Sequence, residues 1–288
     1  MYMMLMFLSV LLSSLRNIFS KGISDISFGT KEFFMSQSVT FLCAGLCLLG
    51  VSENAFDAIS PVTVSYGIIY GIMLIGAQYC YTCAMRGGNM GMCSTIYSMG
   101  FILPTISGFL FWREKLKIAN FLGIVLVIPI IIISGLSPET NKNQKYSDSK
   151  FIFPAVLAMI SSGGLGIMQK VQQNSIWFYQ KEIFLIFAFL LASFVSFVLF
   201  LTAKSSSQRI SPKKYFYGVI IGVAFGFSNL LNTICAGKLK SAVFFPLLNV
   251  STILFSVISG VVIYKEKITY RDILVFLLGA LAIVMISR

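Results

Sequence analysis

The sequence SGFLFWREKL, residues 107–116, ends a long apolar run with three charged residues, and SGVVIYKEKI, residues 259–268, repeats this pattern 152 positions later. In both stretches a Ser-Gly pair precedes a Glu-Lys pair by the same spacing. Two further matches lie upstream in the same order: YGIIYG at 66–71 with YGVIIG at 217–222, and Ser13, Ile18 and Lys21 with Ser162, Ile167 and Lys170. Three ordered matches indicate that the chain consists of two repeats.

The composition is typical of a membrane protein. Of 288 residues, 57% are hydrophobic and 11% are charged, against roughly 25% charged residues in a soluble domain. About 20 apolar residues in a helix cross a hydrocarbon core, and backbone groups in lipid must be satisfied within the segment. Ten charge-free runs therefore predict ten transmembrane helices: 1–15, 33–52, 58–85, 87–112, 118–138, 151–169, 183–203, 215–237, 241–264 and 273–287.

Five helices per repeat is an odd number, so the second repeat enters the membrane in the opposite direction to the first. Such inverted repeats are a common construction in secondary transporters, with the binding site near the midplane between the halves. The predicted fold class is an all-α polytopic membrane protein of ten transmembrane helices in two inverted five-helix repeats. The predicted boundaries are 1–136 for the first repeat, 137–150 for a connecting loop and 151–288 for the second repeat.

The repeated charged cluster ends the fourth helix of each half. Basic residues suit a helix C-terminus, and a glutamate suits the N-terminus of the helix that follows. We therefore expect both glutamates to be structural, with direct substrate binding as the alternative. The predicted structural motif comprises Gly108, Glu114, Lys115, Gly260, Glu266 and Lys267.

Polar side chains within the apolar runs are the candidate solute-binding residues. Each costs free energy in lipid unless it faces protein or water, so one shared cavity accounts for them together. Hydrogen bonding between helices is the alternative for the set, and snorkelling to the headgroups is the alternative for Arg16. Otherwise we expect Arg16 to contact a carboxylate or phosphate. The predicted cavity residues are Arg16, Gln78, Tyr97, Ser98, Ser162, Asn229, Asn232 and Asn249.

Several function classes are excluded by the residues themselves. The chain contains no histidine, and its ten acidic residues all lie outside the charge-free runs, which removes histidine-based chemistry and a mid-membrane carboxylate relay. The formal net charge of +12 is distributed over short connectors, which is typical of a membrane surface rather than a nucleic-acid site. We expect no enzyme activity, no cofactor, no metal and no nucleic-acid partner.

With WREKL at 112–116 and YKEKI at 264–268 closing a glycine-bearing fourth helix in each half, the chain resembles the drug/metabolite transporter superfamily, in particular its EamA-type members. The resemblance covers essentially the whole chain. It implies a cavity lined by the first four helices of each half, and transport of amino acids, other metabolites or drugs, usually outward. It also implies cytoplasmic termini, whereas the distribution of Lys and Arg, eight on the terminal side and fourteen opposite, favours the reverse orientation.

The predicted function is a secondary transporter, an exporter of small organic metabolites or drugs across the plasma membrane by alternating access around a central polar cavity. A non-transporting membrane scaffold or accessory subunit is the alternative. The expected partners are a small-molecule solute and the lipid bilayer, with a homodimer left open. The expected location is the cell membrane as a multi-pass protein, either a bacterial inner membrane or a plasma membrane.

Overall fold

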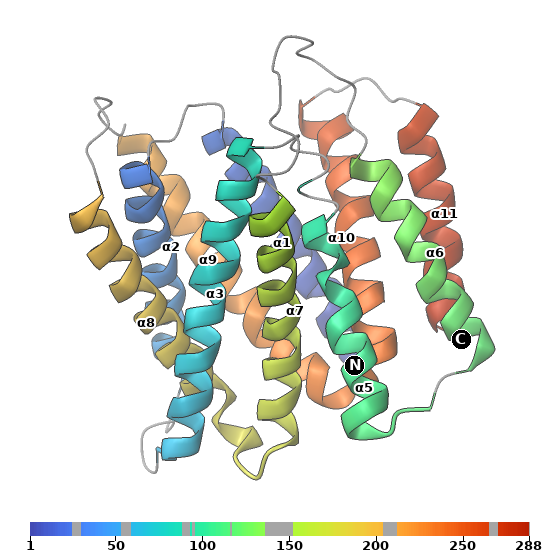
Figure 1. The fold of residues 1–288 in the computed structure, drawn as a ribbon, viewed down its shortest axis with the longest axis horizontal. Helices are drawn as coiled ribbons and strands as arrows, with labels where there is room; N and C mark the ends of the chain where they lie inside the picture. Colours follow the sequence, from blue (N-terminus) through green and yellow to red (C-terminus); the bar gives the residue numbers. More distant parts are fainter. Residues whose placement is uncertain are drawn as a thin grey trace. The chain divides into compact units, whose positions relative to one another are not determined.

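The computed structural model describes residues 1–24, 30–52, 59–87, 93, 96–115, 117–135, 152–203, 212–264 and 270–287. All regular elements in these ranges are helices (Figure 1), which confirms the all-helical fold class for the described residues. They are α1 Tyr2–Ser24, α2 Thr30–Val51, α3 Pro61–Gly87, η1 Met99–Phe101, α5 Ile102–Trp112, α6 Ile118–Gly135, α7 Ile152–Asn174, η2 Phe178–Gln180, α8 Lys181–Thr202, α9 Pro212–Lys238, α10 Ser241–Tyr264 and α11 Tyr270–Ser287.

Five helices in the described part are long and apolar enough to cross a membrane: Lys31–Val51, Pro61–Ala84, Ile152–Asn174, Phe178–Thr202 and Phe216–Lys238. Five shorter apolar helices accompany them: Tyr2–Arg16, Ile96–Trp112, Ile118–Ile133, Ser241–Phe255 and Ile273–Ile286. These segments overlap the ten predicted charge-free runs one by one. That all ten cross the membrane stays a prediction.

The chain forms two compact units, each built from both halves of the sequence. The first unit comprises Met1–Ile75 and Val171–Gly237, and the second comprises Gly76–Lys170 and Lys238–Arg288. The boundary of the predicted repeats, with its loop at 137–150, lies outside the described residues. The repeats are therefore a different division of the chain from the compact units, and their boundaries stay a prediction.

In the first unit, α2 packs along α8. The Ser38 hydroxyl donates to the Ser193 carbonyl at 3.1 Å, and the Ser193 hydroxyl donates to the Ser38 carbonyl at 2.9 Å. Glycines bring further helices into backbone contact, because a Cβ on Gly71 would lie 2.7 Å from the carbonyl oxygen of Ala188, and one on Gly222 would lie 2.5 Å from that of Thr40. Small residues of this kind allow close packing in lipid, where no hydrophobic force drives helices together.

In the second unit, α6 packs along α11, and α10 packs against α5, α6 and α11. The Asn120 side chain donates to the Ile286 carbonyl at 2.8 Å, and a Cβ on Gly123 would lie 2.6 Å from the Ile286 side chain. The segment that starts α5 touches α7, since a Cβ on Gly163 would lie 2.6 Å from the Gly100 carbonyl oxygen. These contacts hold α5, α7 and α10 in the arrangement that builds a charged site.

Candidate functional site

The first unit contains a group of hydrogen-bonded neutral residues, here called the uncharged cluster: Ser9, Tyr70, Ser228, Asn229 and Asn232. The Tyr70 hydroxyl donates to Asn229 Oδ1 at 2.7 Å. The Ser9 hydroxyl donates to Asn232 Oδ1 and approaches the Ser228 carbonyl at 3.3 Å. These bonds connect α1 and α3 to α9, so the cluster joins three helices through neutral groups.

The two asparagines of this cluster have different roles. Asn229 is 7% exposed, and besides accepting from Tyr70 it donates Nδ2 to the Phe225 carbonyl at 2.9 Å. Its amide therefore joins helices, which is the interhelical alternative considered for this residue. Asn232 is half-buried, and within the described part of the chain its Nδ2 donates no hydrogen bond. Asn232 is consequently the better placed of the two to contact a solute.

Arg16 lies against the same helix. Its guanidinium carbon is 4.8 Å from the centroid of the Phe225 ring, a cation–π distance, and Phe225 is one helical turn before Asn229. Arg16 thus contacts α9, the helix that carries Asn229 and Asn232, and all three residues belong to the first unit. That Arg16 contacts a solute stays a prediction.

The other predicted cavity residues, Gln78, Tyr97, Ser98, Ser162 and Asn249, belong to the second unit and are half-buried. The Tyr97 ring centroid lies 4.7 Å from that of Tyr81. Asn249 donates Nδ2 to the Phe245 carbonyl of its own helix at 3.0 Å. That all eight predicted residues line a single cavity stays a prediction.

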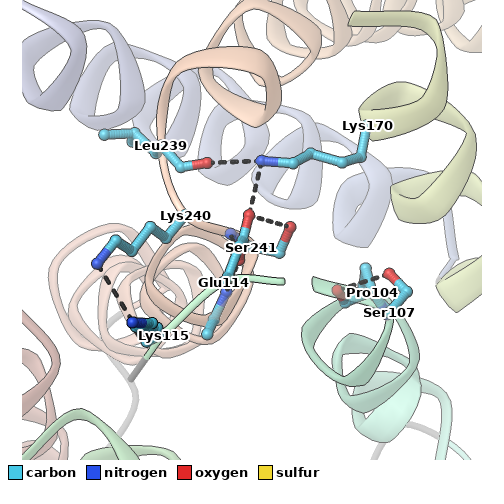
Figure 2. A network of polar contacts seen from close by, with 9 residues as sticks. Pro104, Ser107, Glu114, Lys115, Lys170, Leu239, Lys240 and Ser241 are labelled. Carbon is cyan, nitrogen blue, oxygen red and sulfur yellow. Dashed lines mark hydrogen bonds and ion pairs between the residues drawn. The ribbon is translucent and has the colours of Figure 1, made fainter. Parts of the chain in front are cut away.

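The second unit contains a buried ion pair, and Figure 2 shows its surroundings. Lys170 Nζ lies 2.9 Å from Glu114 Oε1, with the two side chains 6% and 9% exposed. Glu114 Oε2 accepts the Ser241 backbone N–H at 2.7 Å, and Oε1 accepts the Ser241 hydroxyl at 3.2 Å. We call Glu114, Lys170 and Ser241 the charged cluster. It joins the end of α5, the last turns of α7 and the start of α10.

The local sequence explains how Glu114 reaches this position. Helix α5 ends at Trp112, and Arg113 adopts the left-handed conformation at φ 51°, which commonly ends a helix. The Glu114 N–H then donates to the Gly108 carbonyl at 3.1 Å. A Cβ on Gly108 would lie 2.6 Å from Glu114 Oε2 and 2.9 Å from the Ser241 Cβ. Glycine at 108 therefore leaves the space that the carboxylate occupies.

The expected placement of Glu114 at the next helix along the chain is wrong. Its carboxylate lies at the N-terminus of α10, where a negative charge is stabilised by the unpaired N–H groups and the helix dipole. At the start of α6 a different side chain accepts a backbone N–H: Asn120 Oδ1 accepts the Lys117 N–H at 3.2 Å. Lys115 is exposed and contributes its carbonyl to Lys240 Nζ at 3.2 Å (Figure 2).

The second copy of the motif is only partly described. Gly260 lies within α10, whereas Glu266 and Lys267 lie outside the described residues. The roles of these two residues stay predictions from the sequence repeat.

Sequence reasoning missed four partners in these clusters: Ser9, Tyr70, Lys170 and Ser241. Lys170 and Tyr70 were noted only as repeat matches, although a lysine that ends a charge-free run is a signal for a buried charge. Another missed residue is Glu32, which lies in the first turn of α2 and is 9% exposed. Its Oε2 has no hydrogen-bond partner among the described residues.

The chain is similar over its whole length to a solved structure described only as "Crystal structure of protein", with a TM-score of 0.80 and 13% sequence identity, covering 99% of this chain and 95% of the other. At this identity the likeness shows a shared fold. No curated protein sequence matches the chain. The family model described as "Sugar transport protein" matches residues 116–287. Because this match covers more than half of the chain, the protein belongs to the sugar transport protein family, a family of membrane transporters.

Proposed function

We propose that the protein is a secondary transporter that moves a small, neutral, hydroxyl-rich solute such as a sugar. The observation that carries this proposal is Asn232, a half-buried amide whose oxygen is held by Ser9 and whose nitrogen donates no hydrogen bond in the described part of the chain. Amides and hydroxyls both donate and accept, so they match the hydroxyls of a sugar. The family description supports the same solute class.

A small organic anion is the second candidate, because Arg16 lies beside the uncharged cluster. A guanidinium binds carboxylates and phosphates through paired N–H groups. The two candidates differ in one residue: neutral solutes depend on Asn232, and anions depend on Arg16 as well. A membrane scaffold, the remaining alternative, needs neither.

We further propose the inverted-repeat architecture and the alternating access of an EamA-type transporter, with outward transport. The glycine contacts of the first unit support the repeat. Helix α3 approaches α8 at Gly71, and α9 approaches α2 at Gly222. Gly71 and Gly222 occupy the same position of the sequence repeat, so each forms the matching contact between the third helix of one half and the second helix of the other. Cysteine-accessibility labelling at Lys117 and Thr269 in a thiol-free variant tests this arrangement. Labelling of both positions from one side would exclude the inversion.

The connection between α7 and α8 supports a multi-pass location in the cell membrane. Ile176, Phe178 and Tyr179 are 84%, 52% and 52% exposed, at the ends of two helices that are long enough to span a bilayer. Gln172 Nε2 donates to the Trp177 carbonyl at 3.1 Å, which holds the loop in shape. Exposed aromatic residues in this position are typical of the headgroup region.

The experiment is a ligand screen on purified protein in nanodiscs, followed by counterflow in proteoliposomes. The panel contains neutral monosaccharides, sugar phosphates and small carboxylates, and the first readout is solute-dependent thermal protection. We expect a neutral sugar to protect the wild type and to exchange in counterflow, while Asn232→Ala loses protection. Ser65→Ala is the matched control, because Ser65 is exposed and its one hydrogen bond to a described residue is to the Pro61 carbonyl of its own helix.

Each outcome separates the candidates. Protection by sugar phosphates or carboxylates that Arg16→Gln abolishes favours the anion. If the wild type shows neither protection nor counterflow with any class in the panel, the transporter proposal fails and the scaffold is favoured.

A further inference from the structure

Glu114 and Lys170 form a buried ion pair among apolar helices. The solute-binding site proposed above does not use either residue. Both side chains are nearly inaccessible, and their charged atoms are 2.9 Å apart. Removing two charges from water is expensive, and a well-packed apolar pair is often as stable. Stability alone therefore does not account for an ion pair at this position.

Each member of the pair has a second set of partners (Figure 2). Lys170 Nζ also donates to the Leu239 carbonyl at 3.0 Å and lies 6.0 Å from the Trp112 ring centroid. Glu114 also accepts from the Ser241 N–H and hydroxyl at the start of α10. When the pair separates, each charge loses this ion pair but keeps hydrogen-bond partners on the backbone. This lowers the free energy needed to break the bridge.

The pair also connects the two chain segments that make up the second unit. The chain leaves the second unit after Lys170 and re-enters it after Gly237. Lys170, the last residue of the first segment, forms the ion pair with Glu114. Its ammonium group also donates to the carbonyl of Leu239, which lies near the start of the second segment. The Lys170 ammonium group thus connects the end of α5 to the segment before α10, and all three residues belong to the second unit.

From these contacts we propose that the Glu114–Lys170 bridge is a conformational latch, closed in one state of the transport cycle and broken in the other. The inference rests on the proposed transport function. Lys170 and Glu114 act as positioning residues: they set the rate at which the protein changes state and do not contact the solute.

The test separates a latch from a pair needed only for folding. Four variants are compared with the wild type: Glu114→Gln, Lys170→Met, the double variant with both changes, and Lys170→Arg. The double variant replaces the bridge with a neutral pair of similar length. The readouts are thermal stability, protection by the sugar that the wild type binds, and counterflow rate.

We expect each single neutral variant to lose thermal stability and the double variant to recover it, because both charges of the pair are removed together. The double variant should nevertheless exchange solute about tenfold more slowly, which corresponds to about 1.4 kcal/mol in the barrier between the two states, with solute protection unchanged. Lys170→Arg, which keeps the charge, should retain near-wild-type counterflow. A double variant that recovers both stability and rate shows a structural pair only and overturns the latch.

Two further outcomes are also decisive. If the double variant does not fold, the folded fractions of Lys170→Met and Lys170→Arg are compared, and equal counterflow rates overturn the latch. If the wild type itself shows no counterflow, the transport proposal fails first. An active wild type with an equally active double variant contradicts the latch alone.

Discussion

The charged cluster and the uncharged cluster place polar groups among apolar helices in different ways. Glu114 and Lys170 lie near helix ends, where unpaired backbone groups of Ser241 and Leu239 help to solvate them. Tyr70 and Asn229 lie within long helices and bond side chain to side chain. Charges have the larger desolvation cost, so they need the free N–H and carbonyl groups that only helix ends supply. Neutral groups do not need helix ends, and they can keep a donor available for a solute.

The largest effect is expected from Glu114→Ala. It removes the ion pair with the buried Lys170 and the acceptor at the start of α10, which should lower the free energy of unfolding by about 3–5 kcal/mol. The control is Glu182→Ala, whose partner Lys181 is 3.0 Å away with both side chains more than 20% exposed. A surface pair of that kind contributes about 0–1 kcal/mol. Denaturation in mild detergent measures both, and equal losses would mean that burial makes no difference here.

A smaller effect is expected from Gly108→Ala. The new Cβ would lie 2.6 Å from Glu114 Oε2 and 2.9 Å from the Ser241 Cβ, so the carboxylate must shift from α10. We expect a loss of about 1–3 kcal/mol, as for overpacking in a core. Gly50→Ala is the control, since a Cβ there meets nothing within 4 Å. If Gly108→Ala is as stable as Gly50→Ala, the carboxylate does not need the glycine.

Tyr70→Phe tests the uncharged cluster with one atom removed. Asn229 Oδ1 loses its 2.7 Å hydrogen bond, and the expected loss of stability is about 1 kcal/mol. Tyr179→Phe, at a side chain 52% exposed, should have no measurable effect. A loss from Tyr70→Phe that matches Glu114→Ala would contradict the distinction between charged and neutral clusters.

The smallest effect on stability is expected from Ser9→Ala. Interhelical hydrogen bonds in lipid contribute on average about 0.6 kcal/mol, so the change in unfolding free energy should be near that value. Since Ser9 orients the Asn232 amide, sugar protection should weaken, though less than in Asn232→Ala. Unchanged protection in Ser9→Ala would show that the Asn232 amide needs no support from α1.

The sequence predicted the helices well, because charge-free runs of this length have few other structures available in lipid. It also predicted that α5 ends at the WREK cluster, since Gly108 and Glu114 mark that end locally. It could not predict that Glu114 meets Ser241, 127 positions away, or that Asn229 meets Tyr70, 159 positions away. Such partners depend on which helices pack together, and apolar helices carry little sequence information about their neighbours. Asn229 was predicted to line the cavity, with interhelical hydrogen bonding as the alternative, and its amide accepts from Tyr70 of α3.

The pairing of α2 with α8 has a consequence for how the protein is made. Ser38 and Ser193, which exchange hydrogen bonds across this pair, are 155 positions apart. At a synthesis rate of about 5–20 residues per second, α2 waits on the order of ten seconds or more for α8 to leave the ribosome. During that time Ser38 and the backbone-contact faces of Gly71 and Thr40 lack their native neighbours. Neither compact unit is complete until residues of the second half of the chain have been synthesised, so each unit assembles late, from helices that were synthesised far apart in time.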